Sequence, residues 1–167
     1  MIKKRTLLIS QIAVICLLIA ALLYFLPLPT EVDTSFHGAV VTADGDILKT
    51  VDINVDGSKH NYLFKEDLVA LRVSTSSDDW QFATPAKARS PHDMYIDVPY
   101  MSIPTGIAST ADYSGGYYAL CLEYGYFIAG RNDDHTRFLV GSTDADTDPA
   151  TILEFFSAWI DFYFPAA

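Results

Sequence analysis

The sequence predicts a mainly β (α+β) domain carried on a single transmembrane helix. Three features lead to this expectation: a long uncharged run at the start, alternation of apolar and polar residues in the middle, and a helical period at the end. The domain is expected to be an antiparallel sheet, as a sandwich or a small barrel, with a C-terminal amphipathic helix packed on it.

Residues 7–28 are expected to form the transmembrane helix, because no charge interrupts them. A helix of that length spans about 33 Å at about 1.5 Å per residue, and a bilayer core is about 30 Å thick. The alternative is a cleaved signal peptide. Its apolar region is usually shorter, and it ends in a small-x-small cleavage site that is not found here.

The distribution of charge predicts the orientation. Lys3, Lys4 and Arg5 are the only charged residues before Glu31, so all 21 acids and the remaining 8 of the 11 bases follow. The basic end, residues 1–6, should stay cytoplasmic by the positive-inside rule. The expected location is therefore the cell membrane, single-pass, with the C-terminal domain extracytoplasmic. Such an acidic domain repels phosphates, which excludes nucleic acid as a partner.

The domain is expected over residues 36–167, after a short polar tether at 29–35. Its clearest local pattern is a β-hairpin. Apolar and polar residues alternate from Val51 to Val55, Asp56-Gly57 marks a turn, and residues 60–64 return as the partner strand.

Other strands are expected where apolar and β-branched residues recur between turn signals. They are residues 36–41, 68–74, 94–100, 117–122, 126–129 and 137–140. Residues 104–116 are expected to be rich in turns. Residues 75–93 are expected to be a long loop held down by Trp80 and Phe82, and ordered loops of that length are uncommon and sometimes functional.

A helix is expected over residues 149–164, with Asp148 as its cap and Pro149 as its first residue. Its apolar arc is about 200° wide, against roughly 100° for a surface helix. Either the helix sinks into the sheet, or part of its face, including Trp159, also meets a partner.

No cofactor or metal site is predicted. Asp52-x-Asn54-x-Asp56-Gly57 matches the first half of a calcium loop, but its twelfth position is Leu63 where a bidentate Glu belongs. The four histidines show no spacing that suits a zinc site. No catalytic residue is predicted either.

The leading functional hypothesis is a non-enzymatic binding or protein-interaction module, held in the lipid bilayer by residues 7–28 and facing a protein partner at the membrane or cell surface. The second is a surface hydrolase with a site near the 75–93 loop. The third is a ligand or stress sensor, which must signal through a membrane partner because its cytoplasmic end is short. The candidate binding residues are Trp80, Arg89, His92, Asp93 and Trp159.

Overall fold

The computed structural model describes the backbone of residues 2–63, 66–77, 80, 93–100, 107–111, 116–131 and 134–165. A helix, α1, comes first, then eight strands, then two short helices. They are α1 Ile2–Phe25, β1 Leu28–Thr42, β2 Ile47–Asn61, β3 Asp67–Thr75, β4 Asp93–Tyr100, β5 Ile107–Ala111, β6 Gly116–Cys121, β7 Tyr126–Arg131, β8 Asp134–Ser142, α2 Pro149–Phe155 and α3 Ser157–Tyr163. The predicted mainly β class is confirmed.

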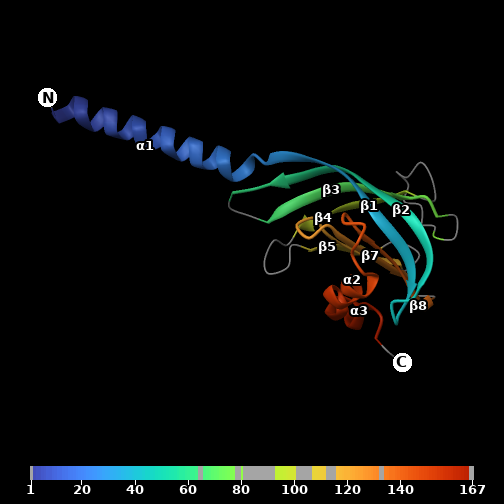
Figure 1. Ribbon diagram of the computed structural model, residues 1–167. Coiled ribbons are helices and arrows are strands. Elements are labelled where there is room, and N and C mark those ends of the chain that lie inside the picture. Colours follow the sequence, from blue (N-terminus) through green and yellow to red (C-terminus); the bar gives the residue numbers. More distant parts are fainter. Residues whose placement is uncertain are drawn as a thin grey trace.

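The eight strands form one antiparallel sheet in the order β4-β3-β2-β1-β8-β7-β6-β5. The sheet curls until its two edge strands, β4 and β5, lie against each other. Long strands twist, and accumulated twist bends a sheet towards closure. The result is a nearly closed barrel (Figure 1), which is one of the two sheet forms that the sequence predicts.

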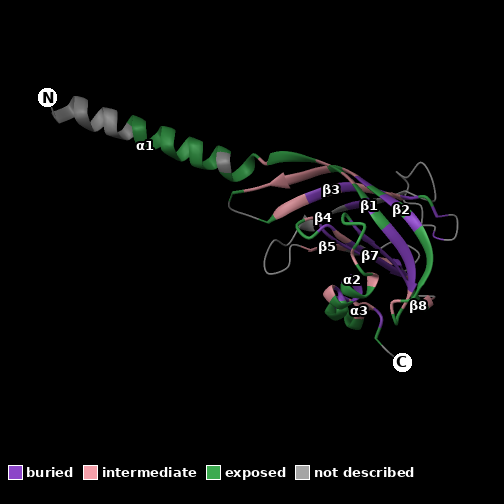
Figure 2. Cartoon of the chain, viewed as in Figure 1, coloured by how far each residue is buried: buried purple, intermediate pink, exposed green. Residues whose placement is uncertain are grey.

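Side chains alternate between the two faces of this sheet, and each face has its own hydrophobic core. The interior of the barrel is filled by buried residues of its strands, including Phe36, Ile53, Leu71 and Phe127. The second core lies outside the barrel. There residues of α2 and α3 cluster with residues of β1, β8, β7 and β6, so the C-terminal helices pack on the sheet as expected. Figure 2 shows the two helices beside β7 and β8.

The C-terminal helical segment begins as predicted but is divided. The Asp148 side chain accepts a hydrogen bond from the backbone N–H of Ala150, and Pro149 occupies the first turn. The expected single helix over 149–164 is wrong in one respect. At Phe156 the backbone leaves helical geometry, with φ −94° and ψ 12°, so α2 and α3 are separate helices.

The predicted tether over residues 29–35 is wrong, because these residues are the first half of β1. The pairing of β1 with β2 starts at Leu28↔Asn61 and continues without a break to Val40↔Lys49. The expected helix over 7–28 also has different bounds: α1 starts at Ile2 and ends at Phe25. Backbone hydrogen bonds to a neighbouring strand can hold polar residues in a strand, and β2 is long enough to provide these bonds.

The predicted hairpin around Asp56-Gly57 is wrong as well, since β2 runs straight through this dipeptide. Gly57 has φ +145°, and a Cβ there would collide with the backbone of Ala70 and Leu71 on β3. The glycine therefore allows close strand approach instead of a turn. The chain turns earlier, at Asp44-Gly45.

Helix α1 extends away from the barrel (Figure 1). Its described side chains are exposed from residue 11 to 22 and at residues 24 and 25. Counting only the part of each helix whose side chains are described, which in α1 leaves out residues 2–10 and 23, no helix combines the length and the hydropathy needed to cross a membrane.

Candidate functional site

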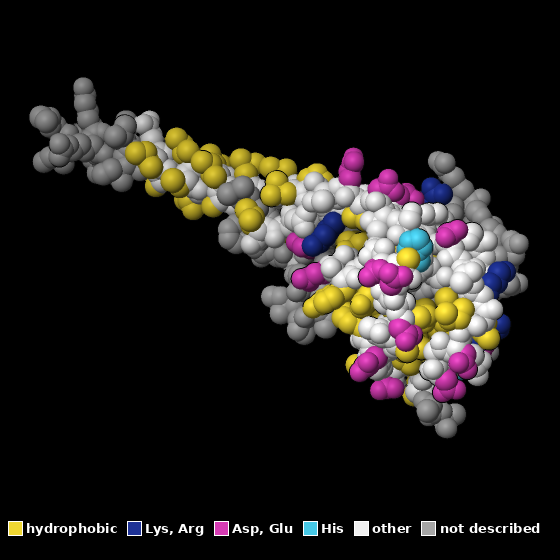
Figure 3. All heavy atoms as spheres, viewed as in Figure 1, with side chains coloured by type: hydrophobic (Ala, Val, Ile, Leu, Met, Phe, Trp, Pro, Cys, Tyr) yellow, Lys and Arg dark blue, Asp and Glu magenta, His cyan; other side chains and the backbone are white. Residues whose placement is uncertain are grey.

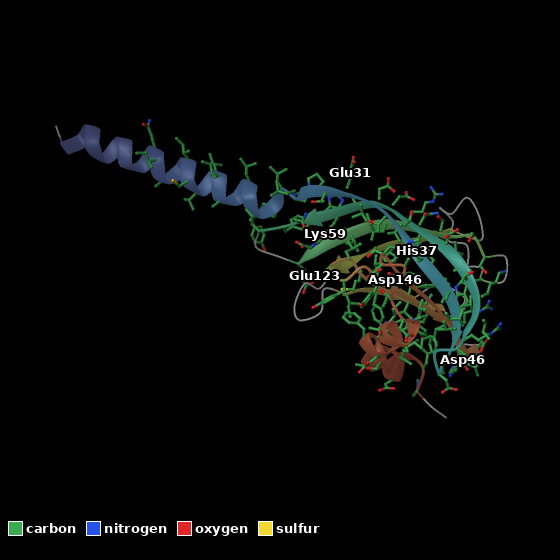
Figure 4. All side chains as sticks on the ribbon, in the orientation of Figure 1. Glu31, His37, Asp46, Lys59, Glu123 and Asp146 are labelled. Carbon is green, nitrogen blue, oxygen red and sulfur yellow. The ribbon has the colours of Figure 1, made fainter. Side chains whose placement is uncertain are left out.

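A polar pocket of about 260 Å³ lies on the outer surface of the barrel, where β1, β2 and the segment after β8 meet. Its walls come from residues His37, Gly38, Thr50, Val51, Asp52, Ser76 and Ala145. Figure 4 shows His37 and Asp146 on this same face. A histidine, a carboxylate and hydroxyl groups thus line one hollow.

The strand register places the central residues of this pocket. His37 on β1 lies opposite Asp52 on β2 and opposite Ser142 on β8. Directly opposite residues of an antiparallel pair share one face, so these three side chains form a polar row across three strands. The row lies just beyond the outer core, which begins two residues later at Ala39.

Two backbone hydrogen bonds bring Ser76 into the pocket. The Asp52 N–H donates to Ser76 Oγ at 3.0 Å, and the Ser76 N–H donates to the Asp52 carbonyl at 3.0 Å. These bonds prolong the β2–β3 ladder past the end of β3. Ser76 is thereby held beside Asp52, although the two residues are 24 positions apart.

The remaining wall is a short acidic segment after β8. The Asp144 N–H donates to Ser142 Oγ at 3.1 Å, and the hydroxyls of Ser142 and Thr147 are 2.9 Å apart. The Asp146 N–H donates to Asp144 Oδ1 at 3.0 Å. These bonds fold the segment over the end of β8 and place Ala145 at the pocket.

The arrangement suits binding through hydrogen bonds. His37 and Asp52 are exposed, and His37 makes no hydrogen bond with a described residue, so its ring nitrogens are available to a ligand. Ser76 Oγ already accepts the bond from Asp52 N–H, and no hydrogen bond between described residues links it to a base. In the described part of the chain, no three His, Cys, Asp or Glu side chains are grouped to hold a metal ion.

The candidate residues expected from the sequence are not brought together. Trp80 is 5% exposed in the interior core, whereas Trp159 is 9% exposed in the outer core. They therefore lie on opposite faces of the sheet. Arg89 and His92 lie outside the described residues. Asp93 opens β4 opposite Ser74, and its side chain also lies outside the described part.

The pocket residues His37, Asp52 and Ser76 are missing from the sequence-based candidates. The sequence carries a signal only for Asp52, as an exposed position of an alternating strand. Nothing in the spacing of the three residues indicates that they meet, because the β1–β2 and β2–β3 registers bring them together.

No known protein family, curated protein or solved structure shows a significant match to this chain. The protein combines a nearly closed antiparallel barrel with outer helices, a polar surface pocket and an N-terminal apolar helix.

Proposed function

We propose that this protein is a membrane-anchored extracytoplasmic binding or protein-interaction module without enzymatic activity. Helix α1 would be its single membrane anchor, and the barrel would be the part that binds. The observation that carries the proposal is α1, an apolar helix that extends away from the barrel (Figure 3).

The exposure of α1 supports an apolar environment. Leu17 is 71% exposed, Leu18 59% and Leu22 56%, with other large apolar side chains between them. Contiguous apolar surface of this kind is unfavourable in water and usually marks contact with a membrane or another protein. From Leu7 to Phe25 the helix contains no charged residue. At about 1.5 Å per residue that stretch covers roughly 28 Å, which approaches the thickness of a bilayer core.

The structure of the barrel favours binding over catalysis. Its interior is filled by side chains of its own strands, so the described groups available to other molecules lie on the surface. The His37–Asp52 pocket offers hydrogen-bonding groups, and no hydrogen bond between described residues links a nucleophile to a base there. Such a site suits weak binding of a protein surface, or of a small polar ligand, better than it suits a covalent reaction.

The anchor can be tested by alkaline extraction of membranes from cells that express the full-length protein. Leu17→Arg together with Leu18→Arg should release the protein into the supernatant, because each arginine at the centre of a span costs about 2.5–3.5 kcal/mol. Leu17→Ile with Leu18→Ile is the matched control and should remain in the pellet. Release of the unaltered protein would exclude the anchor.

The binding role can be tested by crosslinking the tagged full-length protein in intact cells. Helix α1 alone, carrying the same tag, is the matched control and identifies proteins that associate only with the helix. A reproducible partner captured by the full chain and missing from this control is expected. Failure to capture any such protein in repeated experiments would contradict the interaction module.

A second candidate function, a ligand sensor, is favoured by the pocket itself. A small polar molecule bound beside His37 and Asp52 would be read out through a membrane partner of α1. Thermal shift measurements against small polar compounds should then show stabilisation that is lost in His37→Ala but kept in His135→Ala, another exposed histidine. Equal shifts in both variants would exclude this pocket as the sensor site.

A further inference from the structure

We infer that the open edge of β1, between Leu28 and Phe36, binds an extended basic segment of a protein partner by strand addition. The inference rests on the proposed interaction function and names its surface and the chemistry of its partner. In strand addition, backbone hydrogen bonds supply affinity and alternate side chains supply specificity.

Among the strands that the structure describes, the first half of β1 has a neighbour on one side only. Strand β2 pairs with β1 from Leu28 onward, but β8 pairs with it only from His37↔Ser142 to Thr42↔Arg137. After Ser142 the chain turns away into the acidic segment. Figure 1 shows this part of β1 along the upper border of the sheet, between α1 and the barrel. None of the described residues pairs with that border.

The hydrogen-bonding direction along β1 identifies the groups at the open edge. The Thr42 N–H donates to Asp46 on the β2 side, whereas the Ala43 N–H donates to Thr136 on the β8 side. The backbone N–H and C=O groups of successive residues point to alternate sides of a strand. Those of odd-numbered β1 residues therefore point towards β8 or, where β8 is not paired, towards the open edge. The N–H and C=O groups of Glu31, Asp33 and Ser35 therefore point to the open edge.

The charge at this edge indicates what kind of strand it accepts. Glu31 and Asp33 are exposed, and neither forms an ion pair with a described residue. Figure 4 shows Glu31 projecting from the border of the sheet. Residues opposite each other on neighbouring strands have Cβ atoms about 5 Å apart, where opposite charges attract. A partner strand with Lys or Arg at alternate positions would match both carboxylates.

The inward face of the edge indicates which residues of the partner strand lie between its basic positions. Val32 is half-buried and packs against the interior core, as does Leu122. An added strand would place its inward side chains next to Val32, where small apolar residues fit. The expected partner pattern is thus basic and apolar residues in alternation.

A second copy of this chain is a poor occupant of the edge. Antiparallel pairing of two β1 edges about Asp33 would place the two Asp33 carboxylates opposite each other, and like charges in that position are destabilising. Pairing with β2 already holds the edge extended, so a peptide partner would bear most of the ordering cost itself. These two facts favour a different, basic chain.

The test uses full-length protein in detergent micelles and fluorescent peptides with alternating Lys and Val. Two isomeric peptides carry N-methyl groups on opposite edges of the extended chain, so their charge and composition are identical. The isomer whose methyl groups lie on the edge away from β1 should bind. The isomer whose methyl groups replace the N–H donors that face β1 should bind at least about tenfold more weakly. Equal binding by both isomers would reduce the effect to charge attraction and overturn the inference.

A pair of variants at one position separates backbone from charge. Asp33→Asn removes only the carboxylate, whereas Asp33→Pro also removes the N–H that points to the open edge and leaves the β2 ladder intact. Asp33→Pro should weaken peptide binding about three- to tenfold more than Asp33→Asn. Equal peptide affinities of the two variants would contradict strand addition. If Asp33→Pro does not fold, the comparison of the two peptide isomers still tests strand addition.

Two further outcomes also count against the inference. A dimer in sedimentation that Asp33→Pro dissociates would make a second copy the occupant of the edge. If the peptides do not bind at this edge but crosslinking still captures a partner, strand addition is rejected and the proposed function stands. Absence of any crosslinked partner would instead reject the proposed function.

Discussion

Trp159 on α3 donates its indole Nε1–H to the Ser109 hydroxyl on β5 at a distance of 2.9 Å. The two residues are 50 positions apart, and the indole is buried in the outer core. The bond connects the last helix to the edge strand of the sheet, which pairs with β6 alone among the described strands. It satisfies the polar group that a buried tryptophan carries.

Ser109→Ala should destabilise the protein by about 1–3 kcal/mol, because the buried indole N–H loses its acceptor. Trp159→Phe should also destabilise it, through lost packing. In the double variant the effect of Ser109→Ala should nearly disappear, since no N–H remains to be satisfied. Urea unfolding followed by far-UV circular dichroism measures the three values. If the changes in unfolding free energy of the two single variants add fully in the double variant, the bond contributes nothing to stability.

Gly57→Ala should destabilise the sheet by more than about 1 kcal/mol, because φ values of this kind are strained for any residue with a Cβ. The added methyl would also lie 2.9 Å from the Leu71 Cα. Thr50→Ser, on the exposed face of the same strand, is the control and should change stability by less than about 0.5 kcal/mol. A Gly57→Ala protein as stable as this control would show that β2 does not run straight through the dipeptide.

Gly130→Ala should displace Phe164, since the new Cβ would lie 2.7 Å from the Phe164 Cε2. Overpacking of this kind costs about 1–3 kcal/mol. Phe164→Leu alone should also be destabilising, but it should partly restore the Gly130→Ala protein by making room for the methyl group. Thermal unfolding of the single and double variants gives the coupling. If Phe164→Leu lowers stability equally in both backgrounds, the two residues are not in contact.

Asp134 should give a pH dependence of stability. The Thr136 hydroxyl, at 2.6 Å, and the Arg137 guanidinium hold the pKa of the Asp134 carboxyl below its usual value. A group with a lowered folded pKa stabilises the protein above its unfolded pKa, near 3.9, and this contribution is lost as the pH falls through the folded pKa. The loss of stability in Asp134→Asn should therefore be constant near neutral pH and shrink below about pH 4. Urea titrations over that pH range measure it, and a difference that grows in acid would contradict the prediction.

Features that depend on local periodicity could be predicted from the amino-acid sequence. Val51, Ile53 and Val55 alternate with polar residues, and all three are buried in the barrel interior. Asp148 and Pro149 start the C-terminal helical segment where the capping pattern predicts. In each case the determining contacts lie within a few residues, so composition and spacing are sufficient.

Features that depend on a distant strand could not be predicted, because they are fixed by strand pairing in the folded sheet. Asp56-Gly57 has the composition of a turn, yet the backbone of Ala70 lies beside it and β2 continues. Residues 29–35 resemble a tether until β2 pairs with them, and Asp52 meets Ser76 only through the β2–β3 register. Strand pairing joins residues far apart in the chain, and the pattern within one segment does not specify which strand will lie beside it.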